Sequence, residues 1–164
     1  AALAELQKAR ERINSAQADV RENILSLRTT LAGEVDLVQA LRQYVEEFGI
    51  QTGIQTHFVS DLDEPTNLSP IGETQLVCIV QEALANVRKH ARARCVELRL
   101  SASDGRLDVS VIDDGVGFVP QSTRGHFGLE TMRERSQSAG GELTVTSVPG
   151  EGTTIAFWLP RMQQ

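Results

Sequence analysis

Apolar residues recur every seven positions at the start of the chain, at Leu6, Ile13, Val20 and Leu27. No glycine or proline interrupts the first thirty residues. A repeat of seven is typical of a helix that packs against another helix in a coiled coil or bundle. Thirty helical residues would span about 45 Å, which is long for a helix that lies on one small domain. We therefore expect residues 1–32 to form a helix with a partner helix. The alternative is a terminal helix that folds back on its own domain.

Two shorter series of apolar residues follow with helical spacing. The first predicts a helix over Leu37–Phe48, with Asp36 as its N-cap and Gly49 as its end. The second predicts a helix over Gly72–His90. Between the two, the residues Ile54–Val59 favour a strand.

Farther along the chain, apolar and polar residues alternate, which is the pattern of a strand with one buried face. The dipeptide Asp104-Gly105 between two of these stretches is typical of a hairpin turn. The elements expected here are the strands Val96–Leu100, Leu107–Val111, Leu143–Ser147 and Thr153–Leu159 and a helix over Leu129–Ala139. Together with the preceding elements they predict an α/β (α+β) two-layer sandwich. One mixed, mostly antiparallel sheet would carry helices on one face.

Composition narrows the classes of protein that fit. The 164 residues are 40% hydrophobic and 23% charged, with a formal net charge of −6. These values are typical of one soluble globular domain and exclude a disordered chain. The acidic balance argues against nucleic-acid binding through an overall basic surface. No apolar run reaches the roughly 20 residues of a membrane helix. Cys78 and Cys95 lie among apolar residues, so we expect buried free thiols in a reducing, cytoplasmic setting.

A polar group lies on one side of the expected helix over Gly72–His90. Glu82, Asn86 and Lys89 fall within about 60° of each other around its axis. Asparagine has a poor helix propensity, so its position in the middle of a helix needs a reason. A carboxylate and an amide oxygen one turn apart could hold a hard cation such as Mg²⁺. The alternative is a solvent-exposed helix face.

Three glycine-bearing stretches could face a ligand. Asp113–Phe118 directly follows a strand, and its glycines would let a ligand approach the backbone. Gly125–Leu129 opens a helix, whose free N–H groups and dipole favour phosphate. Gly150–Thr154 leads into the last strand. Each stretch by itself is equally consistent with a surface turn or a hairpin.

In combination, these stretches resemble the catalytic ATP-binding domain of sensor histidine kinases, a branch of the GHKL ATPase superfamily with the Bergerat fold. The matching stretches are Glu82–Ala91, Asp113–Phe118, Gly125–Leu129 with Met132–Arg135, and Gly152-Thr153. The third looks most like the branch of the nitrate/nitrite sensors and the membrane-fluidity (DesK-like) sensors. The resemblance covers residues 35–160 and is specific, because the four stretches occur in order at suitable spacing.

The resemblance implies a site for ATP and Mg²⁺. Asn86 would coordinate Mg²⁺ between the phosphates, and Glu82 would act as a base or orient a water on the metal. Asp113 would accept a hydrogen bond from the adenine amino group, and Thr153 would support the adenine through a water. A short lid would span Val119–Phe127. The other residues implied at the nucleotide are Lys89, His90, Gly115, Gly117, Gly125, His126, Phe127, Gly128 and Leu129.

One residue departs from the family pattern. Asp114 stands where the family usually has asparagine. A second carboxylate near a nucleotide would weaken binding, because its charge repels the phosphates. If the Asp114 side chain points away from the nucleotide, the substitution costs nothing.

The histidines are a second point of difference. None of the three, His57, His90 and His126, lies in the N-terminal helix. That helix looks like the second helix of a dimerisation/histidine-phosphotransfer region. The resemblance therefore implies a fragment without its phosphoacceptor histidine, with residues 1–32 from that region and residues 33–164 as the catalytic domain.

The activity implied is that of a protein histidine kinase. It would transfer the γ-phosphoryl group of ATP to a histidine supplied in trans, for relay to an aspartate of a response regulator. The partners implied for the full-length protein are a response regulator with a helix-turn-helix output domain and a second copy bound through the N-terminal helices. Direct nucleic-acid binding is not expected. The chain would be a cytoplasmic portion that meets a membrane only through parts outside it.

Three other functions fit parts of the pattern. A serine-kinase anti-sigma factor shares the fold but would not be expected to carry the long N-terminal helix. A regulatory module could bind nucleotide without transferring phosphate. A pure dimerisation module would leave the glycine-bearing stretches as surface turns, which four stretches in order make improbable.

Overall fold

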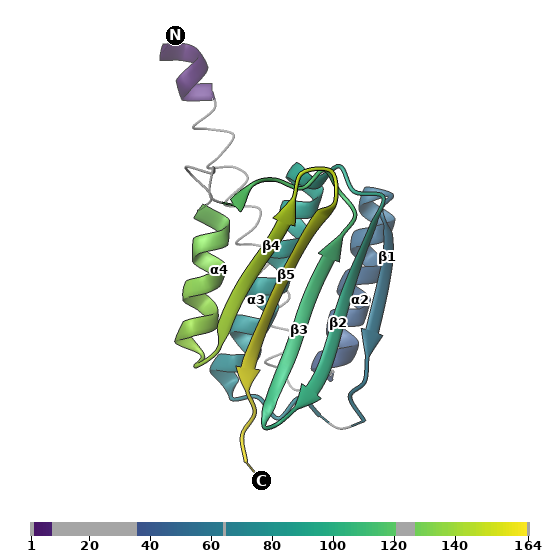
Figure 1. Ribbon diagram of the computed structural model, residues 1–164, viewed down its shortest axis with the longest axis vertical. Coiled ribbons are helices and arrows are strands. Elements are labelled where there is room, and N and C mark those ends of the chain that lie inside the picture. The colour runs from purple at the N-terminus through teal and green to yellow at the C-terminus, as the bar shows by residue number, and fades with distance from the viewer. Residues whose placement is uncertain (1, 8–35, 64, 121–126, 164) are drawn as a thin grey trace. The chain divides into compact units, whose positions relative to one another are not determined.

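The computed structural model describes residues 2–7, 36–63, 65–120 and 127–163 (Figure 1). Contacts between Cα atoms divide the chain into two units, Ala1–Val35 and Asp36–Gln164. In the first unit the described residues are helical and exposed. The rest of the expected N-terminal helix lies outside the described residues.

The second unit is a five-stranded sheet with helices, as the sequence predicts. The strands lie in the order β1-β2-β3-β5-β4. The β1 and β2 strands are parallel, and the other neighbours are antiparallel. The elements are α2 (Leu37–Thr52), β1 (Gln55–Ser60), α3 (Pro70–Asn86), a π-helical turn η1 (Val87–Ala91), β2 (Cys95–Ser103), β3 (Arg106–Asp113), α4 (Phe127–Ser138), β4 (Glu142–Val148) and β5 (Gly152–Pro160).

Strand alternation produces the two layers. In β3, buried residues alternate with half-buried ones from Leu107 to Asp113. The helices α2, α3 and α4 all lie on one face of the sheet (Figure 1). The inward residues Leu98, Val111 and Phe157 are each at most 4% exposed. The sheet therefore has one apolar face under α2, α3 and α4 and one face that none of these three helices covers.

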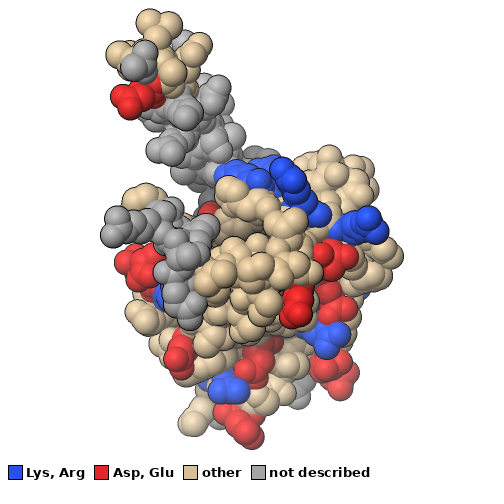
Figure 2. All heavy atoms as spheres, turned by 45° about the horizontal axis from the view of Figure 1, so that its top comes forward, with Lys and Arg blue, Asp and Glu red and all other residues tan. Residues whose placement is uncertain are grey.

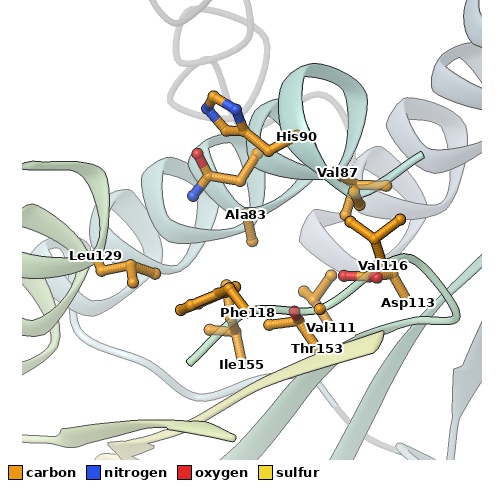
Figure 3. Close-up of a pocket in the computed structure, with 13 residues that line it drawn as sticks. Ala83, Val87, His90, Val111, Asp113, Val116, Phe118, Leu129, Thr153 and Ile155 are labelled. Carbon is orange, nitrogen blue, oxygen red and sulfur yellow. The ribbon is translucent and has the colours of Figure 1, made fainter. Parts of the chain in front are cut away.

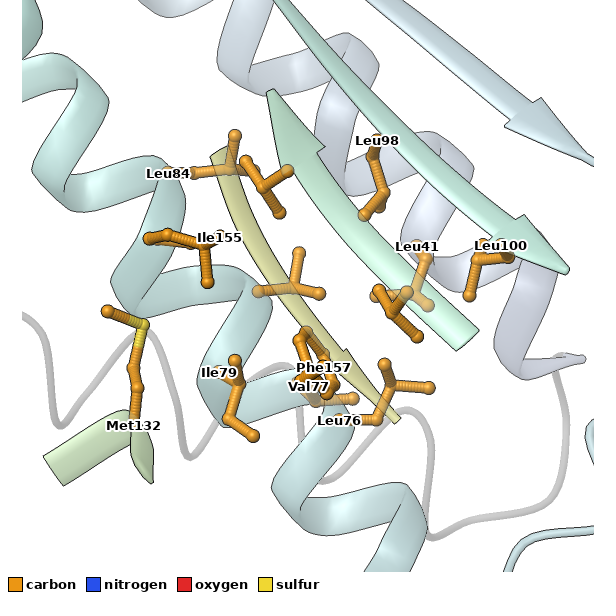
Figure 4. Close-up of a cluster of buried hydrophobic side chains, with 14 of the residues drawn as sticks. Leu41, Leu76, Val77, Ile79, Leu84, Leu98, Leu100, Met132, Ile155 and Phe157 are labelled. Carbon is orange, nitrogen blue, oxygen red and sulfur yellow. The ribbon is translucent and has the colours of Figure 1, made fainter. Parts of the chain in front are cut away.

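Helix α3 is the centre of the core. Ser69 caps it, because its hydroxyl accepts a hydrogen bond from the Gly72 N–H at 3.0 Å, and Pro70 occupies the first turn. Leu76, Ile79 and Leu84 are completely buried, and burial of each such side chain contributes about 2 kcal/mol. Figure 4 shows these side chains between the sheet and the neighbouring helix that carries Met132. This packing fixes the position of the C-terminal end of α3, where Glu82 and Asn86 lie.

The boundaries of α2 differ from those predicted. Gly49 does not end the helix, which continues to Thr52 and closes at Gly53 in the left-handed conformation, φ +74°. A methyl group at Gly49 would lie 2.8 Å from the Thr56 hydroxyl, so this glycine allows close packing on β1. Asp36 precedes the helix but makes no side-chain cap hydrogen bond. The glycine serves a tertiary contact that local sequence does not reveal.

Two smaller predictions have different outcomes. The hairpin turn between β2 and β3 is confirmed, since Asp104 and Gly105 both have positive φ, 38° and 75°. The burial of both cysteines is half right. Cys78 is buried in α3, but Cys95 is only half-buried because it begins β2 at the end of the sheet.

The turn after α4 yields a test of the packing. A methyl group at Gly141 would overlap the carbonyl oxygen of Trp158 in β5. We expect Gly141→Ala to lower the free energy of unfolding by at least about 2 kcal/mol, because backbone must move to relieve the overlap. Gly53→Ala is the control, since Gly53 has positive φ but open space around it, and we expect a loss of about 1 kcal/mol. Urea denaturation measures both. Equal losses would contradict the packing described here.

Candidate functional site

A pocket opens where the C-terminal end of α3, the end of β3, the start of β5 and the start of α4 meet. It encloses about 550 Å³, including space open to solvent. Figure 3 shows that most of its labelled side chains are apolar, with Asp113 on one side, Leu129 on the opposite side and His90 on the helix above them. The lining residues are Ala83, Asn86, Val87, His90, Ala91, Val111, Asp113, Val116, Gly117, Phe118, Leu129, Thr153 and Ile155.

Asp113 places a carboxylate in this apolar wall. It is the last residue of β3, pairs with Thr153 of β5 and is 8% exposed. Burial raises the pKa of Asp113, and the charge of Asp114 raises it further, whereas backbone hydrogen bonds from Gly115 and Thr153 oppose the rise. The Gly115 N–H donates to the Asp113 Oδ1 at 2.8 Å. The carboxylate is therefore an acceptor that a ligand with N–H donors could use.

Asp114 points elsewhere, although it is the next residue. Its Oδ1 accepts hydrogen bonds from the backbone N–H groups of Arg94 and Cys95, at 2.8 and 2.9 Å. These bonds, that of Cys95 first, lower the pKa of Asp114. The side chain does not line the pocket. Its charge is used to hold the start of β2, so the departure from the family's asparagine adds no carboxylate to the pocket wall.

The glycines after β3 allow the backbone to pass closely between two neighbours. A methyl group at Gly115 would overlap the carbonyl oxygen of Ala91, and one at Gly117 would overlap that of Val148. Between them, the Val116 N–H donates to the Ala91 oxygen, and the Val116 oxygen accepts from the Gly150 N–H, each at 2.7 Å. Gly117 lines the pocket, whereas Gly115 supports the loop from outside it.

The helix wall contains a feature that the sequence did not predict. After Asn86, α3 widens into the π-helical turn η1, which ends at Arg92 in the left-handed conformation, φ 50°. Such turns occur frequently at functional sites. His90 and Ala91, the last residues of η1, line the pocket, whereas Lys89 is exposed and does not.

The first turn of α4 contacts the polar residues of α3. A methyl group at Gly128 would overlap the Glu82 carboxylate and lie 3.6 Å from the Asn86 side-chain nitrogen. Leu129 lines the pocket, while Phe127 is 83% exposed. Glu82 does not line the pocket, but it approaches Gly128 together with Asn86, which does line it. Of the remaining predicted residues, Gly125, His126 and most of the expected lid lie outside the described residues.

The side-chain oxygens of Glu82 and Asn86, near the first turn of α4, suit a hard cation. An amide oxygen and a nearby carboxylate match the preference of Mg²⁺, which takes one or two protein ligands together with substrate phosphates. Among the described residues, no group of three or more His, Cys, Asp or Glu side chains could hold a metal. Asn86 and Glu82 therefore fit a metal that is also bound by a phosphate ligand. The described residues do not form a metal site with three or more protein ligands.

Ser147 is a site residue that sequence reasoning missed. Its buried hydroxyl accepts from the Phe118 N–H at 2.9 Å and lies 2.8 Å from the Thr153 hydroxyl. It also donates to the Gly152 carbonyl at 3.0 Å. Ser147 thus holds two pocket-lining residues in place. An isolated serine in the alternating pattern of β4 carries no sequence signal for this role.

Comparison with known proteins identifies the family. Residues 72–163 match the model of the histidine kinase-, DNA gyrase B-, and HSP90-like ATPase family. The chain is 34% identical over 160 residues to the signal transduction histidine-protein kinase/phosphatase DegS of Brevibacillus brevis, covering 97% of this chain and 41% of that protein. It is 34% identical over 148 residues to the nitrate/nitrite sensor protein NarQ of Escherichia coli, covering 88% of this chain and 26% of that protein. The chain therefore spans less than half the length of these relatives.

A solved structure agrees. The histidine kinase domain of a blue-light activated histidine kinase from Erythrobacter litoralis is 28% identical, with a TM-score of 0.63 over 77% of this chain and 61% of that one. The chain belongs to the histidine kinase-, DNA gyrase B-, and HSP90-like ATPase family, as a sensor histidine kinase ATP-binding catalytic domain. Within the described part of the chain, no helix has the length and apolar character to cross a membrane.

The opposite pKa shifts of the adjacent aspartates yield a test. Because the pKa of Asp113 is raised, its ionised form costs stability above that pKa, so Asp113→Asn should raise the Tm near neutral pH. The gain should shrink as the pH falls through the folded-state pKa and vanish below the lower, unfolded-state pKa, where the carboxyl is protonated in both states. The Asn oxygen can still accept the Gly115 N–H.

Asp114→Asn is the matched control with the opposite sign. Its pKa is lowered, so the ionised carboxylate stabilises the fold at neutral pH, and this contribution is lost as the pH falls through the folded-state pKa. We expect a lower Tm near neutral pH and a shrinking difference in acid. Thermal unfolding of the nucleotide-free variants across this pH range measures both. Shifts of the same sign would contradict the assigned environments.

Proposed function

We propose that the pocket binds ATP with its adenine at Asp113 and its phosphates toward Glu82, Asn86 and the first turn of α4, for transfer of the γ-phosphoryl group to a histidine. The observation that carries this proposal is an apolar pocket that contains a buried carboxylate, Asp113, and the amide of Asn86, with the Glu82 carboxylate near that amide at the first turn of α4. A planar, apolar base with an amino group and a charged tail fits that division.

At the adenine end, Asp113 would accept the hydrogen bond from the exocyclic amino group. Thr153 lies beside it, held by Ser147, and would support the base through a water. Gly117 would contact the base directly because it lines the pocket, and Gly115 would act by positioning the loop. The apolar wall that includes Ile155 would exclude water from the base.

At the phosphate end, Asn86 would hold Mg²⁺ through its amide oxygen. When bound, the metal would neutralise charge on the phosphates during transfer. Glu82 would accept a proton or orient a water on the metal. The residues that we assign to phosphate contact are Lys89, His90, Gly125, His126, Phe127, Gly128 and Leu129. The free N–H groups of the first turn of α4 favour such an anion.

The transfer itself would break the bond between the γ-phosphorus and the β,γ-bridging oxygen and form a bond to an imidazole nitrogen. The protein would contribute by position and by electrostatic stabilisation, as in other phosphoryl transfers. We propose that the acceptor histidine is supplied in trans and that its phosphoryl group passes to an aspartate of a response regulator with a helix-turn-helix output domain.

The division of the chain follows from the same proposal. Residues 1–32 would be the second helix of a dimerisation region, and residues 33–164 would be the catalytic domain. In the full-length protein, two copies would associate through the N-terminal helices.

The test is calorimetric titration of the chain with Mg-ADP. We expect saturable binding that Asp113→Asn weakens by about ten- to a hundredfold, because it removes a charged acceptor for the base. Asn86→Ala should remove mainly the dependence on Mg²⁺. Asp61→Asn and Gln137→Ala, which change exposed residues outside the pocket lining, should bind as the wild type does. A folded wild-type chain that does not bind Mg-ADP would refute the proposal.

A further inference from the structure

Three neighbouring arginines differ from the other arginines in the described part of the chain. Among the described residues, six arginines contact a partner within the chain: Arg42, Arg99, Arg106, Arg133, Arg135 and Arg161. The side chains of Arg88, Arg92 and Arg94 make no hydrogen bond, ion pair or ring contact with the described residues. All three are exposed. Asp114 attracts the charge of Arg94, which helps to lower the Asp114 pKa, but the two side chains form no ion pair. Exposed guanidinium groups that make no hydrogen bond or ion pair are available to an anionic ligand.

These arginines concentrate positive charge in an acidic chain. Arg88–Arg94 contains four of the 16 lysines and arginines and no Asp or Glu, whereas the whole chain has a net charge of −6. Figure 2 shows Lys and Arg side chains gathered at one place, while acidic and basic residues mingle elsewhere on that face. Asp114 accepts a hydrogen bond from the Arg94 backbone N–H and also attracts the charge of the Arg94 side chain. The local field is therefore opposite in sign to the overall charge.

The backbone of residues 88–94, which carries these arginines, is held by hydrogen bonds and borders the pocket. Ala91 and His90, between the first two of these arginines, line the pocket. The Ala91 carbonyl accepts the Val116 N–H at 2.7 Å, and Asp114 holds the backbone of Arg94. A ligand that pairs with the guanidinium groups would therefore lie at the rim of the pocket rather than inside it.

We propose that Arg88, Arg92 and Arg94 form a docking surface for a carboxylate-rich segment of a partner protein. Single exposed ion pairs are weak, but several on a fixed backbone steer a partner of opposite charge and set its orientation. A protein is favoured over a lipid surface because the occupant must leave the pocket open to a phosphoryl acceptor. In that respect the inference rests on the proposed function.

The test uses a fluorescein-labelled oligoglutamate peptide as the probe, measured by fluorescence anisotropy at low ionic strength. Overall charge repels this peptide, so binding reports a local basic surface. We expect the triple variant Arg88→Gln/Arg92→Gln/Arg94→Gln to bind about tenfold more weakly. The control Arg99→Gln/Arg106→Gln/Arg133→Gln loses the same charge from arginines that have acidic partners. It should bind within about twofold of the wild type.

Two further arms make the outcome decisive. Mg-ADP titration of the same variants tests the pocket separately. If the triple variant Arg88→Gln/Arg92→Gln/Arg94→Gln keeps nucleotide binding but loses peptide binding, the docking surface is supported. If the wild type does not bind Mg-ADP, that result counts against the proposed function alone. Vesicles of phosphatidylcholine with phosphatidylglycerol test the lipid alternative. Equal peptide binding by both triple variants, no binding by the wild type, or arginine-dependent binding to vesicles but not to peptide would overturn the inference.

Discussion

The buried carboxylate of Asp113 is the constraint on which the rest of the site depends. An ionised group that is 8% exposed costs free energy unless hydrogen bonds compensate it. Backbone hydrogen bonds from Gly115 and Thr153 oppose the rise in its pKa but do not cancel it. The remaining acceptor capacity lies in an apolar pocket, where a hydrogen bond to a ligand is stronger than it would be in water. The fold therefore keeps a group that destabilises it, which is a common compromise at binding sites.

Close backbone packing converts this carboxylate into a site. The loop after β3 passes between η1 and the β4–β5 turn, and only glycine fits at Gly115 and Gly117 without moving a carbonyl group. At the other end, Gly128 brings the first turn of α4 against Glu82 and Asn86. Helix α3 connects the two ends because its buried residues fix it to the sheet. Asp114 contributes from outside by holding the start of β2, so adjacent carboxylates have opposite tasks.

The sequence predicted β2 and β3 well because each has one buried face, so that apolar and polar residues alternate along it. It also predicted six of the residues that line the pocket: Asn86, His90, Asp113, Gly117, Leu129 and Thr153. Features that depend on contacts between residues far apart in the sequence could not be predicted. A glycine such as Gly49 is typical of a helix end. Its role in the structure, however, is to allow close packing against Thr56 on the neighbouring strand. The π-helical turn η1 continues the apolar spacing of α3, so the sequence pattern does not distinguish it from the α-helix. Ser147 acts through Phe118, which is far away in sequence.

The orientation of the nucleotide is the central claim, and a crystal structure of the chain with Mg²⁺ and a non-hydrolysable ATP analogue tests it most directly. The account predicts the adenine amino nitrogen within hydrogen-bond distance of the Asp113 carboxylate, the metal on the Asn86 oxygen, and Asp114 still bonded to the backbone of Arg94 and Cys95. An analogue bound with its phosphates at Asp113, or with its adenine outside the pocket, would contradict the account.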